Sequence, residues 1–282
     1  MQMMKVFGLM AGLTVLLVAL GSYLGGSQGA VLFLVLAAVM NFGMYWFSDR
    51  AVLRMYKARM LGPEDAPDLY RMVDRLRQEA GLPMPTLALA PSEQPNAFAT
   101  GRNAANAVVC VTAGIVRLLP PRELEGVIAH ELGHIKHRHM LVGTVAATMA
   151  GAVAMLASVA RWGLIFGMGG RDDRDQNPLG LLIMAIVAPI AAVIVQMAIS
   201  RQNEFQADAT AARLTRDPGG LATALRRIEG YASKIPMAVN PAAAQLAIIN
   251  PLSGARVPAL AGLFRTHPPT EERIERLSQL QL

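Results

Sequence analysis

The sequence predicts a mainly α-helical protein with a small β-sheet, in which an α+β domain is joined to four transmembrane helices arranged as two hairpins. First, 53% of the 282 residues are apolar and 16% are charged, whereas a soluble globular chain has about 45–50% and about 25%. Second, long uncharged stretches occur at two places, and polar segments with helix-like and strand-like patterns follow each of them. This composition excludes a disordered chain, a collagen-like chain and an ordinary soluble enzyme.

The first uncharged stretch lies between Lys5 and Asp49, and it is more than twice the about 20 residues that cross a bilayer once. A secretory signal peptide explains it poorly, because such a peptide is shorter and no second span follows it at once. The segment Gly25–Gly29 interrupts the stretch. We therefore expect a transmembrane hairpin over residues 1–48, with spans at Val6–Leu24 and Ala30–Phe47.

A second transmembrane hairpin is predicted over residues 140–200. Met140–Ala160 and Asn177–Ser200 carry no charge, and the charged segment Arg171–Asp175 between them reads as the turn. The third span is the weaker of the two, because it is rich in Ala and Gly and Arg161 follows it. The alternative is a pair of buried helices in a large soluble core.

The basic residues predict the orientation of both hairpins. Lys and Arg collect in the cytoplasmic loops of membrane proteins, and here they flank the outer ends of the hairpins, whereas the turn of the first has none. We expect a multi-pass protein of the cytoplasmic (inner) membrane, with both termini on the cytoplasmic side. Residues 49–139 and 201–282 then share one compartment and fold together. The flanking basic residues are Lys5, Arg50, Arg54, Lys57, Arg59, Lys136, Arg138 and Arg201.

The polar segments predict helices and a small sheet. Apolar residues at helical spacing predict a helix that ends before Gly81, Pro120–Pro121 opens another, and Thr270 is expected to cap the last. The proline-containing segment 236–258 reads as a long loop. The only cysteine, Cys110, excludes an internal disulfide and a cysteine-based metal site. Strands are expected at residues 83–90, 97–100 and 107–112, with a turn at 101–103.

The segment His130-Glu131-Leu132-Gly133-His134 carries the chemistry. Residues four apart share one face of a helix, so both imidazoles can reach one ion. A catalytic zinc has three protein ligands and a fourth position for water, and Glu131 can accept the proton of that water. The alternative is a surface helix end at a membrane interface, which is the interpretation we favour for His137 and His139 themselves.

The third ligand is expected directly after the second hairpin. Glu204 and Asp208 lie four apart on one helical face, so one can bind the ion while the other accepts a hydrogen bond from a ligand imidazole. The alternative is a solvated acidic face paired with Arg201. Because the orientation places these acids in the compartment of the histidine pair, we favour the metal site.

These motifs resemble the HtpX-type membrane zinc endopeptidases of the minigluzincin group, which also includes the CAAX prenyl proteases. The resemblance covers nearly the whole chain: Asn96-Ala97-Phe98-Ala99 resembles the family's NAFA segment, residues 200–208 its SRxxExxAD segment, and residues 267–277 its HPxxxxRIxxL segment. It implies a zincin-like catalytic domain with one Zn²⁺ held by His130, His134 and Glu204. It further implies that Asp208 supports a ligand and that Asn96, Ala97, Phe98 and Ala99 form an edge strand that binds substrate.

The resemblance also implies an activity, namely zinc-dependent endopeptidase cleavage of misfolded or damaged membrane proteins under stress. The expected partners are unfolded or membrane proteins and the lipid bilayer. Alternatives are a selective processing peptidase resembling the CAAX prenyl proteases, and a non-catalytic, zinc-stabilised membrane chaperone or binding protein. Nucleic acid is not expected, because the basic residues lie at the span ends and form no separate patch.

Two further residues are candidates for accessory roles. His267 can pack behind the last helix, stabilise an oxyanion or approach the metal as a gating fourth ligand. Arg201 can pair with Asp208 or with a substrate carboxylate.

Overall fold

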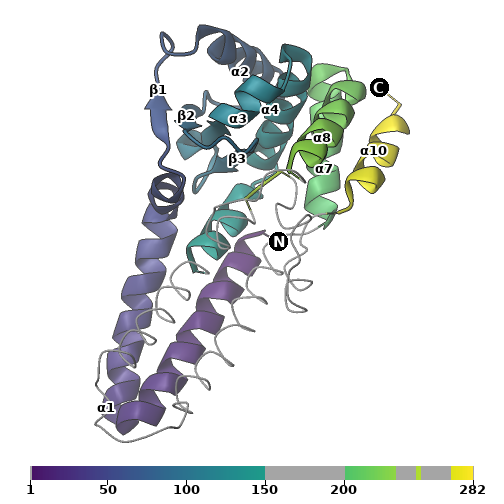
Figure 1. Ribbon diagram of the computed structural model, residues 1–282. Helices are drawn as coiled ribbons and strands as arrows, with labels where there is room; N and C mark the ends of the chain where they lie inside the picture. Colours follow the sequence, from purple (N-terminus) through teal and green to yellow (C-terminus); the bar gives the residue numbers. More distant parts are fainter. Residues whose placement is uncertain (1, 150–200, 233–245, 249–267, 282) are drawn as a thin grey trace, which may run out of the picture.

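The computed structural model describes residues 2–149, 201–232, 246–248 and 268–281. In this part of the chain a long helical hairpin projects from a domain made of a four-stranded sheet and helices (Figure 1). The mainly helical architecture with a small sheet is therefore as predicted. The helices are α1 (Gln2–Met55), α2 (Pro67–Ala80), α3 (Ala113–Leu118), α4 (Pro121–Lys136), α7 (Arg201–Thr215), α8 (Pro218–Ala232) and α10 (Thr270–Ser278); the strands are β1 (Arg59–Leu61), β2 (Thr86–Ala90), β3 (Ala97–Thr100) and β4 (Val108–Thr112).

Helix α1 consists of two helical arms that meet at a break. Gly26 has φ 58° and ψ −142° there, a conformation that residues with a side chain rarely adopt. The arms, Met3–Tyr23 and Gly25–Met55, are each long and apolar enough to cross a bilayer. The break falls where the sequence predicts it, but the second arm runs beyond the expected end at Phe47, because its last turns are buried against the sheet.

A shorter apolar helix, Met140–Met149, packs against the first arm of α1. It is the beginning of the predicted third span. The rest of that span, the fourth span and nearly all of the loop predicted over 236–258 lie outside the described residues, so the second hairpin stays a prediction. The side chains that join the short helix to α1 include Leu9, Leu13, Leu141, Val142 and Val145.

The sheet has the strand order β1-β2-β4-β3. Strand β2 runs parallel to β4, and β1 and β3 run antiparallel to their neighbours. The three predicted strands are present, although β2 begins only at Thr86, because Pro83 and Pro85 have no backbone N–H to donate to a ladder. Strand β1 was not predicted, since three residues carry too little alternation to be recognised.

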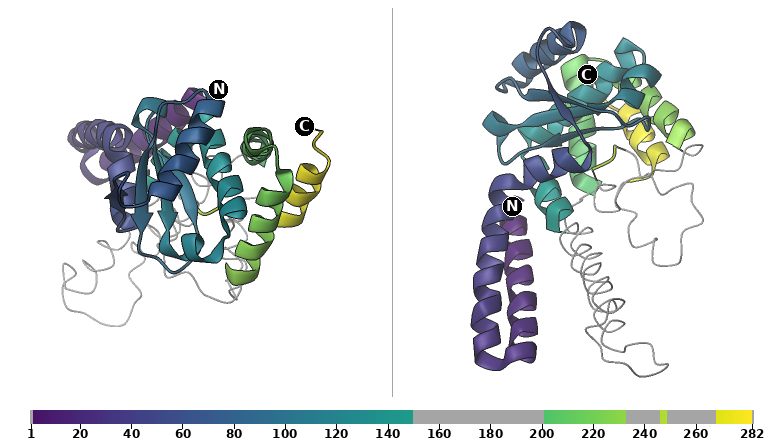
Figure 2. Two further views of the ribbon diagram at one scale, coloured as in Figure 1. Left: turned by 90° about the horizontal axis from the view of Figure 1, so that it is seen from above. Right: turned by 60° about the vertical axis from the view of Figure 1, so that its left-hand side comes forward.

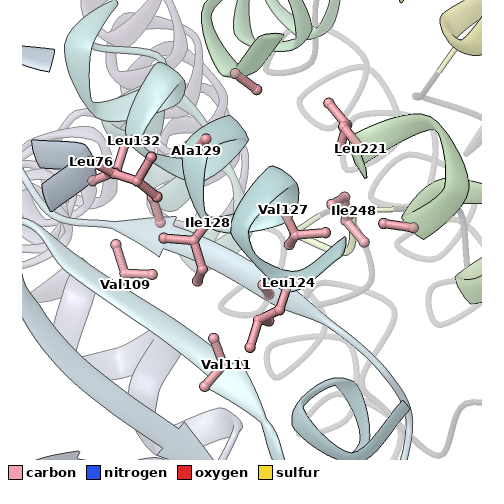
Figure 3. Packing of buried hydrophobic residues seen from close by; sticks show 14 of the residues in the cluster. Leu76, Val109, Val111, Leu124, Val127, Ile128, Ala129, Leu132, Leu221 and Ile248 are labelled. Atoms are coloured by element: carbon pink, nitrogen blue, oxygen red, sulfur yellow. The ribbon is translucent and has the colours of Figure 1, made fainter. Parts of the chain in front are cut away.

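The sheet is covered on both faces. On one face Val109 and Val111 of β4 lie under Leu124 and Ile128 of α4 (Figure 3). The alternate residues of the same strands form a second cluster with the end of α1, so the hairpin and the domain share buried surface. That second cluster contains Val52, Leu53, Tyr56, Ala88, Ala90, Phe98, Val108 and Cys110.

Helices α7 and α8 pack against α4, and α10 packs against α7 and α8, on the side of the domain away from α1 (Figure 2). The expected cap of α10 is wrong: Pro269 is the N-cap residue and no side chain caps the helix, because Thr270 is already its first residue. Leu277 of this helix is buried. Arg273, which lies on the same face, is buried as well.

Candidate metal and catalytic site

Helix α4 begins with Pro121 in its first turn and is buried along most of its length. Its position between the sheet and helices α7 and α8 fixes the directions of its side chains. His130 and His134 share one face, and the Nε2 atoms of the two rings are 3.1 Å apart. The sequence therefore predicted correctly that the two imidazoles converge.

Glu204 of α7 completes a group of three donors. Its Oε2 lies 3.7 Å from Nε2 of His130, and its Oε1 lies 3.4 Å from Nε2 of His134. Donors at 2.0–2.1 Å from a tetrahedral zinc ion are roughly 3.4 Å from one another. Two imidazoles and one carboxylate at these separations fit a Zn²⁺ ion in both donor type and spacing.

A close contact between α4 and α7 brings the donors together. A Cβ on Gly133 would lie 3.1 Å from the Cα and the carbonyl oxygen of Ala207. Only glycine therefore permits this approach without displacing a backbone. Gly133 and Ala207 lie next to His134 and Asp208 in the chain, so the contact sets the spacing between the histidines and the acids.

His130 is held from behind by an ion pair. Its Nδ1 lies 2.9 Å from Oδ1 of Asp208. Arg273 of α10 donates two hydrogen bonds to that carboxylate, from Nε at 2.8 Å and from Nη2 at 2.7 Å. Burial alone would raise the pKa of Asp208, but the charge and hydrogen bonds of Arg273 outweigh burial and lower it. Asp208 is therefore ionised and directs the proton of His130 to Nδ1.

His134 is held by another histidine. Helix α4 ends at Lys136, and Arg138 takes a left-handed conformation with φ 59° that turns the chain back. His139 is thereby buried, with its Nδ1 at 3.2 Å from Nδ1 of His134. His139 is thus buried against the ring of His134, whereas the sequence suggested a position on the surface. Burial lowers the pKa of His134 to about 3 and that of His139 to about 4, so both rings are neutral.

Glu131 lies on the sheet side of the donor group. Its carboxylate is buried and accepts a hydrogen bond from the backbone N–H of Ala99 in β3. Burial raises the pKa of Glu131 to about 7. A carboxyl group with this pKa can both accept and return a proton near neutral pH.

Strand β3 is an edge of the sheet, as expected for the segment beside the site. Antiparallel pairing alternates between residues bonded to the neighbour and residues that point away. Asn96 bonds to Thr112 of β4 through its backbone oxygen. The alternation then directs the backbone groups of Ala97 and Ala99 to the free edge, in agreement with the bond from Ala99 to Glu131.

The side chain of Asn96 is buried and hydrogen-bonded within the protein. Its backbone N–H donates to Thr112 Oγ1, its side-chain amide donates to the Tyr56 hydroxyl at 3.4 Å, and its side-chain oxygen accepts from Ile248 N at 3.0 Å. This bonding differs from the expected substrate contact. It joins β3 to the end of α1 and to the segment that accepts a hydrogen bond from Arg273.

The two accessory candidates have different outcomes. Arg201 is exposed at the start of α7, and Asp208 pairs with Arg273 in place of Arg201. His267 lies outside the described residues. The sequence analysis did not predict the roles of Arg273 and His139. The signals that could have indicated them are the segment HPPTEER, which ends in Arg273, and the position of His139 five residues after His134.

A buried acid beside two imidazoles of one helix and a carboxylate of another is the arrangement of a metallopeptidase. The sequence profile of Peptidase family M48 matches residues 63–281. The chain belongs to this family, so it is a metalloprotease, and the family implies a bound metal ion.

Two relatives of similar sequence agree with this assignment. A protease HtpX homolog of Gemmatimonas aurantiaca is 56% identical, and the alignment covers 99% of each chain. One of Pelotomaculum thermopropionicum is 49% identical over 100% of each chain. The crystal structure of S. mikatae Ste24p aligns with a TM-score of 0.49 and 17% identity, covering 98% of this chain and 65% of that one.

Proposed function

We propose that this protein is a membrane-integrated endopeptidase that uses one Zn²⁺ ion held by His130, His134 and Glu204. The observation that carries the proposal is the convergence of these three donor groups, from two helices, within 4.8 Å of one another. A bound zinc polarises a carbonyl group and lowers the pKa of water. Both effects are what hydrolysis of a peptide bond requires.

The residues around the donors have separate tasks in this mechanism. Glu131 accepts the proton of the attacking water and delivers it to the leaving amine, for which its raised pKa suits it. Asp208 keeps His130 in the tautomer whose Nε2 is free to bind the ion. Arg273 keeps Asp208 ionised and in place.

The substrate chain pairs with the free edge of β3. Ala97 and Ala99 present backbone groups to that edge, and a peptide can add to it as a further strand. Recognition through the backbone implies little sequence preference. Asn96 supports this edge from inside and does not contact the substrate, and Phe98 faces the end of α1.

The membrane arms determine which proteins reach the site. The domain lies at the end of the hairpin opposite the break at Gly25 and Gly26 (Figure 2), so loops and ends that emerge from the bilayer come close to it. This protein has four spans and a cytoplasmic catalytic domain. Its natural substrates are therefore misfolded or damaged membrane proteins. This role is proteolytic quality control.

Glu131→Gln tests the mechanism. The detergent-purified protein is incubated with zinc and a denatured membrane protein, with and without a chelator. We expect the variant to retain zinc and to cleave about 10²- to 10⁴-fold more slowly, the range for loss of a general base.

Glu125→Gln is the matched control, because Glu125 lies on the same helix and pairs with Arg75 instead of facing the donors. It should cleave at the wild-type rate. Cleavage by Glu131→Gln at the wild-type rate, or wild-type cleavage that survives the chelator, would contradict the mechanism.

A further inference from the structure

The tautomer of His134 depends on the bonding of its neighbours. A ring that binds a metal through Nε2 must carry its proton on Nδ1, and that proton needs an acceptor. For His130 the acceptor is Asp208. For His134 the atom in reach is Nδ1 of His139, at 3.2 Å, and an imidazole nitrogen accepts only when it carries no proton.

Hydrogen bonds from α7 show which nitrogen of His137 carries the proton. The hydroxyl of Thr210 donates its single proton to the backbone carbonyl oxygen of Gln206, at 2.8 Å. Its oxygen must therefore accept at its second contact, from Nε2 of His137 at 2.8 Å. The neutral ring of His137 then has a bare Nδ1, which accepts from the side-chain Nε2 of Gln206 at 3.1 Å.

The same amide reaches His139. The side chain of Gln206 also lies near the ring of His139 and raises its pKa slightly against the larger effect of burial, which lowers it. A His134 that binds through Nε2 donates from Nδ1, so Nδ1 of His139, at 3.2 Å, is the acceptor and His139 carries its own proton on Nε2, where the amide oxygen of Gln206 can accept it. The His139 backbone N–H also donates to the carbonyl oxygen of His134 at 2.9 Å, so the ring cannot move away easily.

We propose that His139 is a positioning residue that accepts a hydrogen bond from the Nδ1–H of His134 and so keeps the Nε2 lone pair of His134 directed at the donor group. Gln206 supports His139 where its amide oxygen accepts a hydrogen bond from the Nε2–H of that ring. This inference rests on the proposed metal site. It assigns a function to a histidine that binds neither metal nor substrate.

Two substitutions at position 139 separate hydrogen bonding from packing. His139→Asn loses ring volume but can place its side-chain oxygen where Nδ1 was, whereas His139→Leu fills the volume and has no acceptor. The affinity for Zn²⁺ is measured by competition with a chromophoric chelator, in the absence of any peptide substrate. We expect Asn to bind within about threefold of wild type and Leu to bind about 10- to 100-fold more weakly, the range for loss of a group that orients a ligand.

His137→Ala is the control, because it removes a neighbouring imidazole that does not touch a donor residue. It should change zinc affinity by no more than about threefold, within the twofold to threefold scatter of single interactions. Wild-type affinity in His139→Leu, equal losses in Leu and Asn, or an equal loss in His137→Ala would each overturn the inference.

Thermal unfolding of the zinc-free proteins identifies a variant that does not fold. If His139→Leu does not fold, His139→Asn decides alone, and a loss of tenfold or more in its affinity overturns the inference. If the wild-type protein itself binds no zinc, the proposed function is wrong, and this result differs from every outcome at position 139.

Discussion

The two imidazoles of the proposed metal site are held by neighbours of opposite character. His130 is fully buried against an ionised carboxylate that an arginine neutralises. His134, with 15% of its side chain exposed, is held by neutral groups, namely the ring of His139 and behind it the amide of Gln206. Both arrangements place the ligand proton on Nδ1, and neither adds net charge to the site.

The comparison shows that a fixed tautomer does not require a buried charge. The ion pair behind His130 gives a stronger acceptor, but it requires an arginine from a distant helix to offset the cost of burying a carboxylate. The neutral groups behind His134, His139 and Gln206, come only from the end of α4 and from α7. The two sides should therefore differ in how much of the fold depends on them.

Asp208→Ala should have the largest effect. It leaves the guanidinium of Arg273 buried without its main partner, and removal of one member of a buried pair costs about 3–5 kcal/mol. We expect the free energy of unfolding of the zinc-free protein to fall by that amount, measured with denaturant in detergent. Asp74→Ala is the control, because its pair with Arg77 is exposed, and it should leave stability unchanged. Equal stability of Asp208→Ala and wild type would show that the pair is not a folding element.

The next largest effect is a difference in zinc affinity between Asp208→Asn and His139→Asn. Asp208→Asn retains an acceptor but removes the charge that neutralises Arg273, so zinc affinity should fall about 10- to 100-fold. His139→Asn, which replaces one neutral acceptor by another, should not show this loss. Chelator competition on both proteins measures the difference, and identical affinities would remove the distinction between a charged and a neutral side.

Gly133→Ala should disturb both sides together. The new methyl group meets the backbone of Ala207 at 3.1 Å, and overpacking of this kind costs about 1–3 kcal/mol. Because the contact sets the distance between α4 and α7, stability and zinc affinity should fall together. Gly230→Ala is the control, since a Cβ there meets nothing within 4 Å. A Gly133→Ala protein with wild-type affinity would show that the helix spacing does not control the donors.

Gln206→Leu should give the smallest effect. It removes the acceptor for the second nitrogen of His139, one step behind the ring that touches His134. The loss of one neutral hydrogen bond at the low end, about 0.5 kcal/mol, corresponds to about a twofold weaker affinity for zinc. A loss as large as that of His139→Leu would mean that Gln206, and not His139, determines the tautomer.

The parts of this site that sequence predicts are those with local spacing. His130 and His134 share a face because a helix has 3.6 residues per turn, and the same rule places Glu204 and Asp208 together. Helix α2 and three of the four strands follow from their apolar patterns and the residues that end them. In each case the distance along the chain is short enough for geometry to follow from residue type.

The parts that sequence does not predict are set by tertiary contacts. Arg273 reaches Asp208 across 65 residues, and no local pattern says that an arginine on an otherwise polar helix is buried. His139 reaches His134 because Arg138 takes a left-handed conformation that is uncommon outside glycine and asparagine. The third and fourth spans and the role of His267 stay predictions from composition and resemblance.

Val52, Leu53 and Tyr56, at the end of α1, are buried against the sheet, so the membrane hairpin also covers one face of the sheet. A truncated protein that begins at Arg59, made to obtain a water-soluble enzyme, would expose Phe98 and Cys110. It would also lack the Tyr56 hydroxyl that bonds to Asn96. Such a fragment would be prone to aggregate. The helix that anchors the enzyme in the bilayer therefore also contributes to the hydrophobic core beneath the sheet.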